Sequence, residues 1–384
     1  MANMLDYLRW RGDLSFSQAP LCEVDSLVLC RAAYLPLEGA VPGDFSGALP
    51  LGAAAARVLE DAAAGKRAFR REDDAALARE LLGSERFSGL GVTGFRSRFN
   101  PEREEQFAAV TFLLPDGPFV SFKGTDGTLV GWKEDFNMAF ADATPGQRDA
   151  VEYLESAAAA LPGDLRVAGH SKGGNLAMYA SAFCGEKTRG RVAYVRNMDG
   201  PGFNEKLIAS EGFSQITGRT HTYLPQSSIF GMLLGHNEDF SIVHSVESGL
   251  FQHDLYSWEV ERTGFVPVGS LTNSSQFIDA SLKNWLSAMD DATREKVVDS
   301  LFEVLGAANV RTIRALRSAK SRVAILKAAK EMDGEQREFM LEAIGLLRSS
   351  MKKSLPVGLG LFGEKKQRRG REPGGNRAEP NRSA

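Results

Sequence analysis

The chain is poor in cysteine, and this scarcity limits the kinds of site that the sequence can build. Only three cysteines occur among its 384 residues, at Cys22, Cys30 and Cys184, and their spacing matches no metal-ligand motif. An odd number of cysteines without such spacing favours buried free thiols and a reducing compartment. We therefore expect a cytoplasmic protein, and the sequence implies neither a metal ion nor an organic cofactor.

Long apolar segments and a strong charge bias are also absent. No segment has the roughly eighteen consecutive apolar residues that a membrane-spanning helix needs. Charged residues interrupt the N-terminal stretch before a useful apolar run forms, so we expect no secretory signal. The formal net charge of −3 gives no reason to expect a nucleic acid partner. What remains is the composition of a globular protein, 25% charged and 43% hydrophobic.

Strand and helix patterns alternate in the middle of the chain. This alternation predicts an α/β fold with a mainly parallel sheet and helices on both of its faces. We assign residues 91–270 to this core and expect residues 1–90 to pack on it as an N-terminal segment. Residues 271–355 have helical patterns throughout, and the basic tail at 356–384 has too little apolar surface to fold, so we expect it to be disordered.

The individual elements follow from apolar periodicity and from turn residues. Strands are predicted at Ser26–Cys30, Gln106–Leu113, Phe119–Phe122, Leu165–Ala168, Arg191–Met198 and Arg219–Leu224, with the second and third forming a hairpin. Helices are predicted at Leu51–Glu60, Asp73–Leu82, Pro145–Leu161, Asn204–Ser210, Phe277–Leu282, Val297–Leu305, Val310–Ala329 and Glu335–Arg348.

Residues Gly169 to Gly173 spell a GxSxG pentapeptide, and its flanking sequence is typical of a nucleophile elbow. A short apolar strand precedes it, and a helix of small and apolar residues begins at Gly174. In such an elbow the turn strains the backbone of the serine, here Ser171, and exposes its hydroxyl at the end of the sheet. The N–H groups at the helix N-terminus then point at the group under attack. The alternative is an ordinary glycine-rich turn.

A nucleophilic serine needs a base, and the chain has five histidines. His170 lies inside the elbow and is expected to point away from the nucleophile, while His221 and His244 lie in predicted strands. His236 and His253 lie in loop-like sequence. We choose His253 because it follows the last predicted strand, where the base falls in hydrolases whose triad runs Ser, acid, His. A histidine of an ordinary surface loop is the alternative.

The acid that would orient the base is harder to place. Its usual loop follows the second strand beyond the elbow, and here that loop, residues 224–228, holds no carboxylate. Asp199 ends the first strand beyond the elbow, at the edge where the serine emerges, and is our choice. Its alternative is a turn aspartate, because Asp-Gly-Pro-Gly is turn chemistry in its own right. The other candidates are Glu238, Asp239 and Asp254.

Two backbone N–H groups are predicted to hold the oxyanion. One belongs to Lys172, directly after the serine, and the other to Thr125, in the segment 122–127 that follows an earlier strand. Glycines in this segment let a backbone N–H turn inward, and Thr125 could add its hydroxyl. A plain hairpin loop is the alternative.

The FKGT sequence at 122–125 and the GHSKGG sequence at 169–174 resemble the α/β-hydrolase superfamily, and most of all the class 3 lipases. Those lipases typically have an F-[RK]-G-[TS] oxyanion loop, a W-x-x-D segment and then GHSLGG. The resemblance implies that Ser171 is the nucleophile, that Thr125 is an oxyanion residue and that Asp135, which ends the W-x-x-D counterpart, is structural.

Two residues depart from the lipase pattern. Lys172 replaces the usual leucine, and its cation could attract an anionic substrate group or pair with a nearby acid. Ser228 falls about where the lipases carry their acid. More closely, the GHSKGGN, DGPGF, PQSSIFGMLL and QHDLYSWEV segments resemble an uncharacterised family of bacterial hydrolase-like proteins over roughly residues 1–260. That resemblance suggests Ser171, Asp199 and His253 as the constellation and supplies no substrate.

These features predict a lipase-like or esterase-like serine hydrolase that cleaves a carboxylic ester or thioester. Ser171 would attack the acyl carbon of a small-molecule or lipid-like substrate, with His253 as base and Asp199 as acid. The alternative is a hydrolase-fold scaffold with a weak or inactive site that binds a protein partner through its C-terminal helices. The missing acid in the usual loop favours that alternative, and the intact elbow favours the enzyme.

Overall fold

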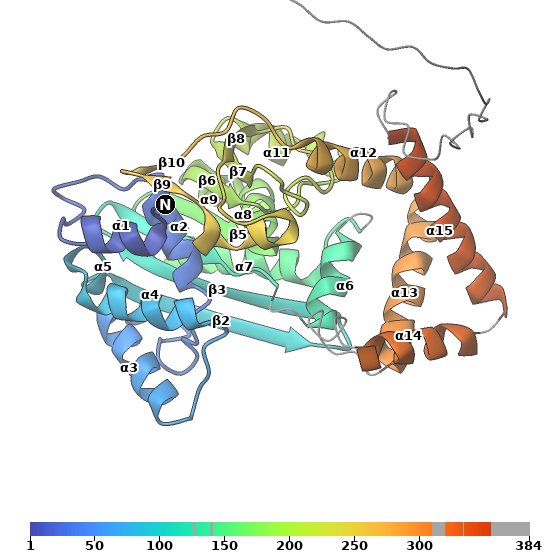
Figure 1. The fold of residues 1–384 in the computed structure, drawn as a ribbon. Coiled ribbons are helices and arrows are strands. Elements are labelled where there is room, and N and C mark those ends of the chain that lie inside the picture. The colour runs from blue at the N-terminus through green and yellow to red at the C-terminus, as the bar shows by residue number, and fades with distance from the viewer. Residues whose placement is uncertain (126–127, 139–140, 309–318, 333, 355–384) are drawn as a thin grey trace, which may run out of the picture.

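The computed structural model describes residues 1–125, 128–138, 141–308, 319–332 and 334–354. The tail at 356–384, predicted to be disordered, lies outside these residues. So do residues 126–127 of the expected oxyanion segment and the first part of the helix expected from Val310. Figure 1 draws all of them as a thin grey trace.

A single eight-stranded sheet organises the described residues, and its strands lie side by side in chain order (Figure 1). Strands β1 to β4 pair antiparallel, whereas β4 to β8 pair parallel. The carboxyl ends of the parallel strands therefore meet at one edge. The strands are β1 Leu49–Pro50, β2 Gly91–Asn100, β3 Glu105–Leu114, β4 Gly117–Phe122, β5 Leu165–His170, β6 Val192–Met198, β7 Thr220–Pro225, β8 Asp239–Val243 and, in a separate pair, β9 Val260–Glu261 and β10 Gly264–Phe265.

Helices account for most of the remaining described residues. They are α1 Met4–Arg11, α2 Glu23–Ala32, α3 Leu51–Ala63, α4 Glu72–Gly83, α5 Glu85–Ser88, α6 Leu129–Asn137, α7 Pro145–Ala160, α8 Lys172–Phe183, α9 Glu186–Gly190, α10 Glu205–Ile208, α11 Glu211–Thr217, α12 Asn273–Ser287, α13 Asp291–Ala307, α14 Ala319–Glu331 and α15 Gly334–Ser354. Two short 3-10 turns, η1 Gly249–His253 and η2 Leu255–Ser257, follow β8.

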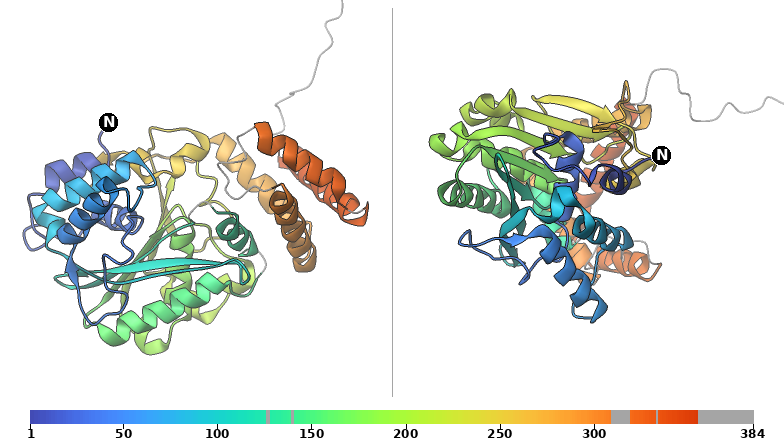
Figure 2. Two further views of the ribbon diagram at one scale, coloured as in Figure 1. Left: turned by 90° about the horizontal axis from the view of Figure 1, so that it is seen from below. Right: turned by 90° about the vertical axis from the view of Figure 1, so that its left-hand side faces the viewer.

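Helices cover both faces of the sheet (Figure 2), and a cluster of buried apolar side chains lies on each face. On one face α2 packs on β4 and β5, joined by α1, α3, α4 and the segment around Trp258. On the other face α7 packs on β3 and β4, and α8 packs on β4, β5 and β6, with α11 beside it. The elbow strand β5 lies between the two clusters, so its carboxyl end is held rigidly from both sides.

The predicted fold class is confirmed: the chain has an α/β-hydrolase-like sheet with helices on both faces and a helical C-terminal region. The predicted hairpin is present, with Leu114 paired to Gly117 across its turn. Thr144 caps α7 as expected, and its hydroxyl accepts a hydrogen bond from the backbone N–H of Gln147. The side-chain oxygen of Gln147 accepts one from the backbone N–H of Thr144, which completes a capping box.

The strand predicted at Ser26–Cys30 is wrong, because these residues lie within helix α2. Leu27, Val28, Leu29 and Cys30 are all fully buried, so α2 is apolar around its whole circumference at this point. A helix buried on every side has no polar stripe, and its short apolar run reads like a buried strand.

The helices α12 to α15 form a separate layer beyond one end of the sheet (Figure 1). α12 packs on α15, and a small apolar cluster of Met289, Val297 and Ala343 lies between these helices and α13. α13 in turn contacts α6, which leads back to the sheet. Among the described residues, no helix is both long and apolar enough to cross a membrane.

Candidate active site

Ser171 occupies the sharp turn between β5 and α8. Its backbone has φ 61° and ψ −134°, a left-handed φ that a non-glycine residue adopts only under constraint. The neighbouring glycines allow the turn to close. A Cβ at Gly169 would lie 2.1 Å from the carbonyl oxygen of Gly173, and a Cβ at Gly173 would lie 2.1 Å from that of Phe122. The GxSxG pattern is therefore required by backbone contact at this turn.

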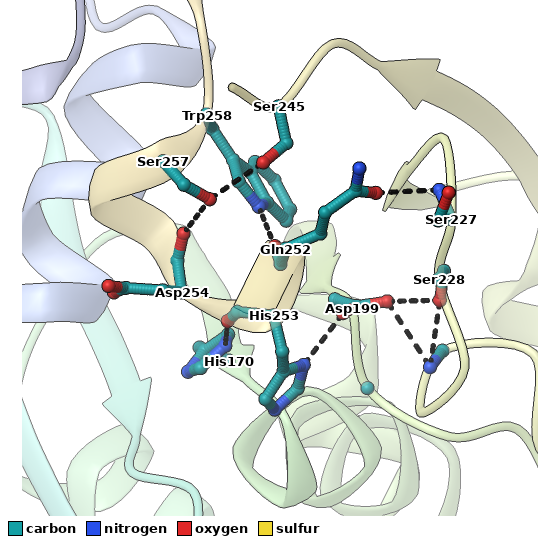
Figure 3. Close-up of polar contacts among 12 residues, drawn as sticks. His170, Asp199, Ser227, Ser228, Ser245, Gln252, His253, Asp254, Ser257 and Trp258 are labelled. Carbon is teal, nitrogen blue, oxygen red and sulfur yellow. Dashed lines mark hydrogen bonds and ion pairs between the residues drawn. The ribbon is translucent and has the colours of Figure 1, made fainter. Parts of the chain in front are cut away.

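His253 and Asp199 come together near the carboxyl edge of the sheet (Figure 3). Nδ1 of His253, at the end of the 3-10 turn η1, lies 2.6 Å from Oδ2 of Asp199, which directly follows β6. Asp199 is fully buried. Its other oxygen, Oδ1, accepts hydrogen bonds from the hydroxyl of Ser228 at 2.5 Å and from the backbone N–H of Gly231 at 3.2 Å. These donors fix the carboxylate and leave Oδ2 for the imidazole.

The ring of His253 is held between two other rings. The His170 ring lies 4.5 Å away and the Phe230 ring 4.4 Å away, centroid to centroid. Nε2 of His170 also lies 2.8 Å from the backbone oxygen of His253, and the indole N–H of Trp258 donates to the neighbouring oxygen of Gln252 at 2.9 Å (Figure 3). The turn that carries His253 is thus anchored through its backbone.

Tyr34 links this turn to the segment after β4. Its hydroxyl lies 2.9 Å from Nδ1 of His170 and accepts a hydrogen bond from the backbone N–H of Gly124 at 2.8 Å. Burial, followed by the charge of nearby His253, holds the pKa of His170 well below its usual range, so His170 is neutral. Sequence reasoning missed Tyr34. It comes from the N-terminal segment, where no motif marks it.

Thr125 and Asp135 form a second contact beside the elbow. The hydroxyl of Thr125 donates to Oδ2 of Asp135 at 2.6 Å. Burial raises the pKa of Asp135 to about 7, although the Lys172 ammonium and the Thr125 hydrogen bond act in the opposite direction. Asp135 lies on α6, so the W-x-x-D segment is helical and touches the expected oxyanion segment.

The side chain of Lys172 turns away from the substrate side and into the protein. It is fully buried, and its Nζ donates to the backbone oxygen of Gln106 at 2.5 Å, to Oε1 of the same residue at 2.9 Å and to Oε2 of Glu134 at 2.9 Å. The expectation that the Lys172 cation pairs with a nearby acid is confirmed, and the acid is Glu134. Attraction of an anionic substrate group is wrong, because every donor is directed inward.

The other candidate residues have partners elsewhere. Glu238 accepts from the hydroxyl of Thr222 at 2.5 Å and lies 2.7 Å from Nδ1 of His236. Asp254 forms an ion pair with Arg71. The remaining candidates lie in or next to the last strand, where Asp239 pairs in register with His221 and His244 lies 2.6 Å from a Glu259 oxygen. Among the histidine and acid candidates, the structure therefore joins two pairs, His236 with Glu238 and His253 with Asp199.

An apolar hollow of about 400 Å³, open to solvent, adjoins Ser171. Its lining consists of Trp132, Asp135, Phe136, Ser171, Lys172, Pro201, Phe230 and Leu233. Within the described ranges, no group of His, Cys, Asp and Glu side chains is placed to hold a metal ion.

The fold and the strained serine between a parallel strand and a helix are those of an α/β-hydrolase-like protein. The chain belongs to the Mbeg1-like family, a lipase-like family whose profile matches residues 81–303. This match begins later than the resemblance expected from residue 1 and extends past residue 260 into α13. Among curated proteins, none matches this chain.

Proposed function

We propose that this protein is a serine hydrolase that cleaves a carboxylic ester or thioester through an acyl-enzyme. Ser171 attacks the acyl carbon, and His253 takes its proton. Asp199 holds the imidazole in the correct tautomer. The N–H groups of Lys172 and Thr125 stabilise the oxyanion, and water then releases the acyl group from Ser171.

The observation that carries this proposal is the 2.6 Å contact between Nδ1 of His253 and Oδ2 of Asp199. A carboxylate beside Nδ1 favours the tautomer with its proton on Nδ1. In this tautomer Nε2 is free to accept a proton, as a general base must. The strained φ of Ser171 supports the proposal independently, because such strain is retained mainly where a backbone must present a functional group. The apolar hollow beside Ser171 suits an acyl group.

One observation favours the alternative, an inactive scaffold that binds a protein partner through α12 to α15. Although both residues belong to the described part of the chain, no hydrogen bond joins Ser171 Oγ to the His253 ring. Active hydrolases can also have a long serine–histidine distance before substrate binds. The two functions therefore differ in the reactivity of Ser171, which is directly measurable.

Labelling with a fluorophosphonate probe tests the proposal. Wild-type protein should be labelled, and Ser171→Ala and His253→Ala should both abolish labelling without loss of the fold. His244→Ala is the matched control, because His244 also lies beside a carboxylate, that of Glu259, and has no part in the proposed mechanism. Folded wild-type protein that stays unlabelled would exclude the enzyme and support the scaffold.

A further inference from the structure

Two consecutive residues of α6 hold the side chains of the two proposed oxyanion residues. Glu134 binds Nζ of Lys172 at 2.9 Å, and Asp135 binds Oγ1 of Thr125 at 2.6 Å. Lys172 begins α8, and Thr125 follows β4. One short helix is thus attached to both sides of the proposed oxyanion hole.

Glu134 is the more deeply anchored of the two acids. It is fully buried, and besides Lys172 it accepts hydrogen bonds from the backbone N–H of Gln106 at 3.1 Å and of Gly146 at 2.6 Å. A Cβ at Gly146 would lie 2.7 Å from Glu134 Oε1, so a larger residue there would force this carboxylate to shift. These contacts join α6 to the start of β3, to the first turn of α7 and, through Lys172, to the elbow.

The ion pair has no evident advantage for stability alone. Removing two charges from water is costly, and buried pairs replaced by apolar side chains of similar volume often leave a protein as stable or more stable. Uncharged side chains at both Lys172 and Glu134 would avoid that cost. The energetic argument therefore points to a geometric function for the pair.

We propose that Lys172 and Glu134 are positioning residues for the oxyanion hole, an inference that rests on the proposed function. Their ion pair fixes α6 against the elbow and so keeps Thr125, held by Asp135, at a constant distance from the backbone N–H of Lys172. Neither side chain touches the substrate. Since displacement of a reacting group by about 1 Å can slow catalysis about 100-fold, loss of the pair should impair the oxyanion hole even in a folded protein.

A double variant separates geometry from stability. Lys172→Met and Glu134→Gln each leave one charge buried and unpaired, which destabilises the protein. The double variant removes both charges and retains an amide oxygen for the N–H of Gly146, so its Tm should return toward the wild-type value. We expect its kcat to remain about 10-fold to 100-fold lower, with KM little changed.

Binding of a trifluoromethyl ketone supplies a second readout, because its adduct with Ser171 places a negative oxygen in the oxyanion hole. The inhibition constant of the double variant should rise by about the factor by which kcat falls. Arg67→Met is the control, since Arg67 forms a half-buried ion pair with Asp61 at 2.8 Å in the N-terminal segment. It should lower Tm and leave kcat and the inhibition constant unchanged.

The outcomes are distinguishable. A double variant with wild-type Tm, kcat and inhibition constant would overturn the positioning role while leaving the hydrolase intact. The positioning role would also be overturned if activity fell only in proportion to Tm, to the same degree in the single variants and in Arg67→Met. Wild-type protein that reacts with neither ester, ketone nor fluorophosphonate would overturn the proposed function and this inference together.

Discussion

Ser228 donates its hydroxyl to Oδ1 of Asp199 at 2.5 Å, and His253 occupies the other oxygen of the same carboxylate at 2.6 Å. Ser228 lies in the loop after β7, where the acid was expected from the sequence. In this protein that loop contributes a hydrogen-bond donor, and the neighbouring loop contributes the carboxylate. The two loops are adjacent because β6 and β7 pair parallel. The Asp199 carboxylate is therefore bound by residues of both loops and by His253.

Substitutions at these two positions should differ in severity. Asp199→Asn should lower kcat about 10,000-fold, because an amide favours the wrong imidazole tautomer. Ser228→Ala should lower kcat only about 10-fold, since it removes one hydrogen bond to a charged group while the N–H of Gly231 continues to donate. Steady-state hydrolysis of an activated ester would measure both. Equal losses would mean that Asp199 has no special function.

Tyr34 offers a second test, because its hydroxyl joins the segment after β4 to His170. Tyr34→Phe leaves the N–H of Gly124 and Nδ1 of His170 without their partner. We expect a loss of about 1–3 kcal/mol in the free energy of unfolding and a lower kcat. Urea unfolding and ester hydrolysis would measure the two effects. Tyr179→Phe is the control, because Tyr179 lies on the opposite face of the sheet, where its ring packs on that of Phe183. A Tyr34→Phe protein indistinguishable from Tyr179→Phe would contradict this link.

Much of the fold and part of the site could be predicted from local sequence patterns. The elbow, the hairpin and the cap of α7 depend on residues close together in the chain, so their sequence is informative. The contacts of Tyr34 and Glu134 join residues far apart in the chain, and no spacing rule reveals such pairs. The misassigned strand at Ser26–Cys30 failed for another reason: its burial depends on neighbours that only the tertiary structure supplies.

The stability of the protein should depend on the protonation of Asp135. Burial raises the pKa of its folded form to about 7, whereas an aspartate in an unfolded chain has a pKa near 3.9. Between about pH 4 and pH 7 the unfolded chain therefore ionises more readily, and this group lowers stability as pH rises through that window. The neighbouring Lys172 and His253 oppose the shift, and Glu134 adds to it.

Asp135→Asn removes this titration. At pH 8 the variant should be more stable than wild type, by about 1.4 kcal/mol for each unit of the pKa shift. Near pH 4 the two proteins should have similar stability. Urea unfolding of both proteins at several pH values would measure the difference. A constant difference across this range would show that Asp135 does not titrate in it.

Helix α13 packs on the outer side of α6. Lys133 Nζ lies 2.8 Å from Oδ1 of Asp299, and the ring of Phe136 meets that of Phe302 edge to face at 6.0 Å. Helix α6 is thus held from inside by the buried ion pair and from outside by the helical region. Phe302→Ala removes the outer ring contact and leaves the inner one.

Hydrogen–deuterium exchange would show whether the outer contact matters to α6. In Phe302→Ala we expect faster exchange in Leu129–Asn137 and unchanged exchange in α8, because α6 loses packing while the elbow keeps its own. Val323→Ala on α14 is the control, since Val323 is 67% exposed and has little packing to lose. If α6 exchanges at the wild-type rate in both variants, its position is set from the inside alone, and the helical region has no mechanical connection to the site through this helix.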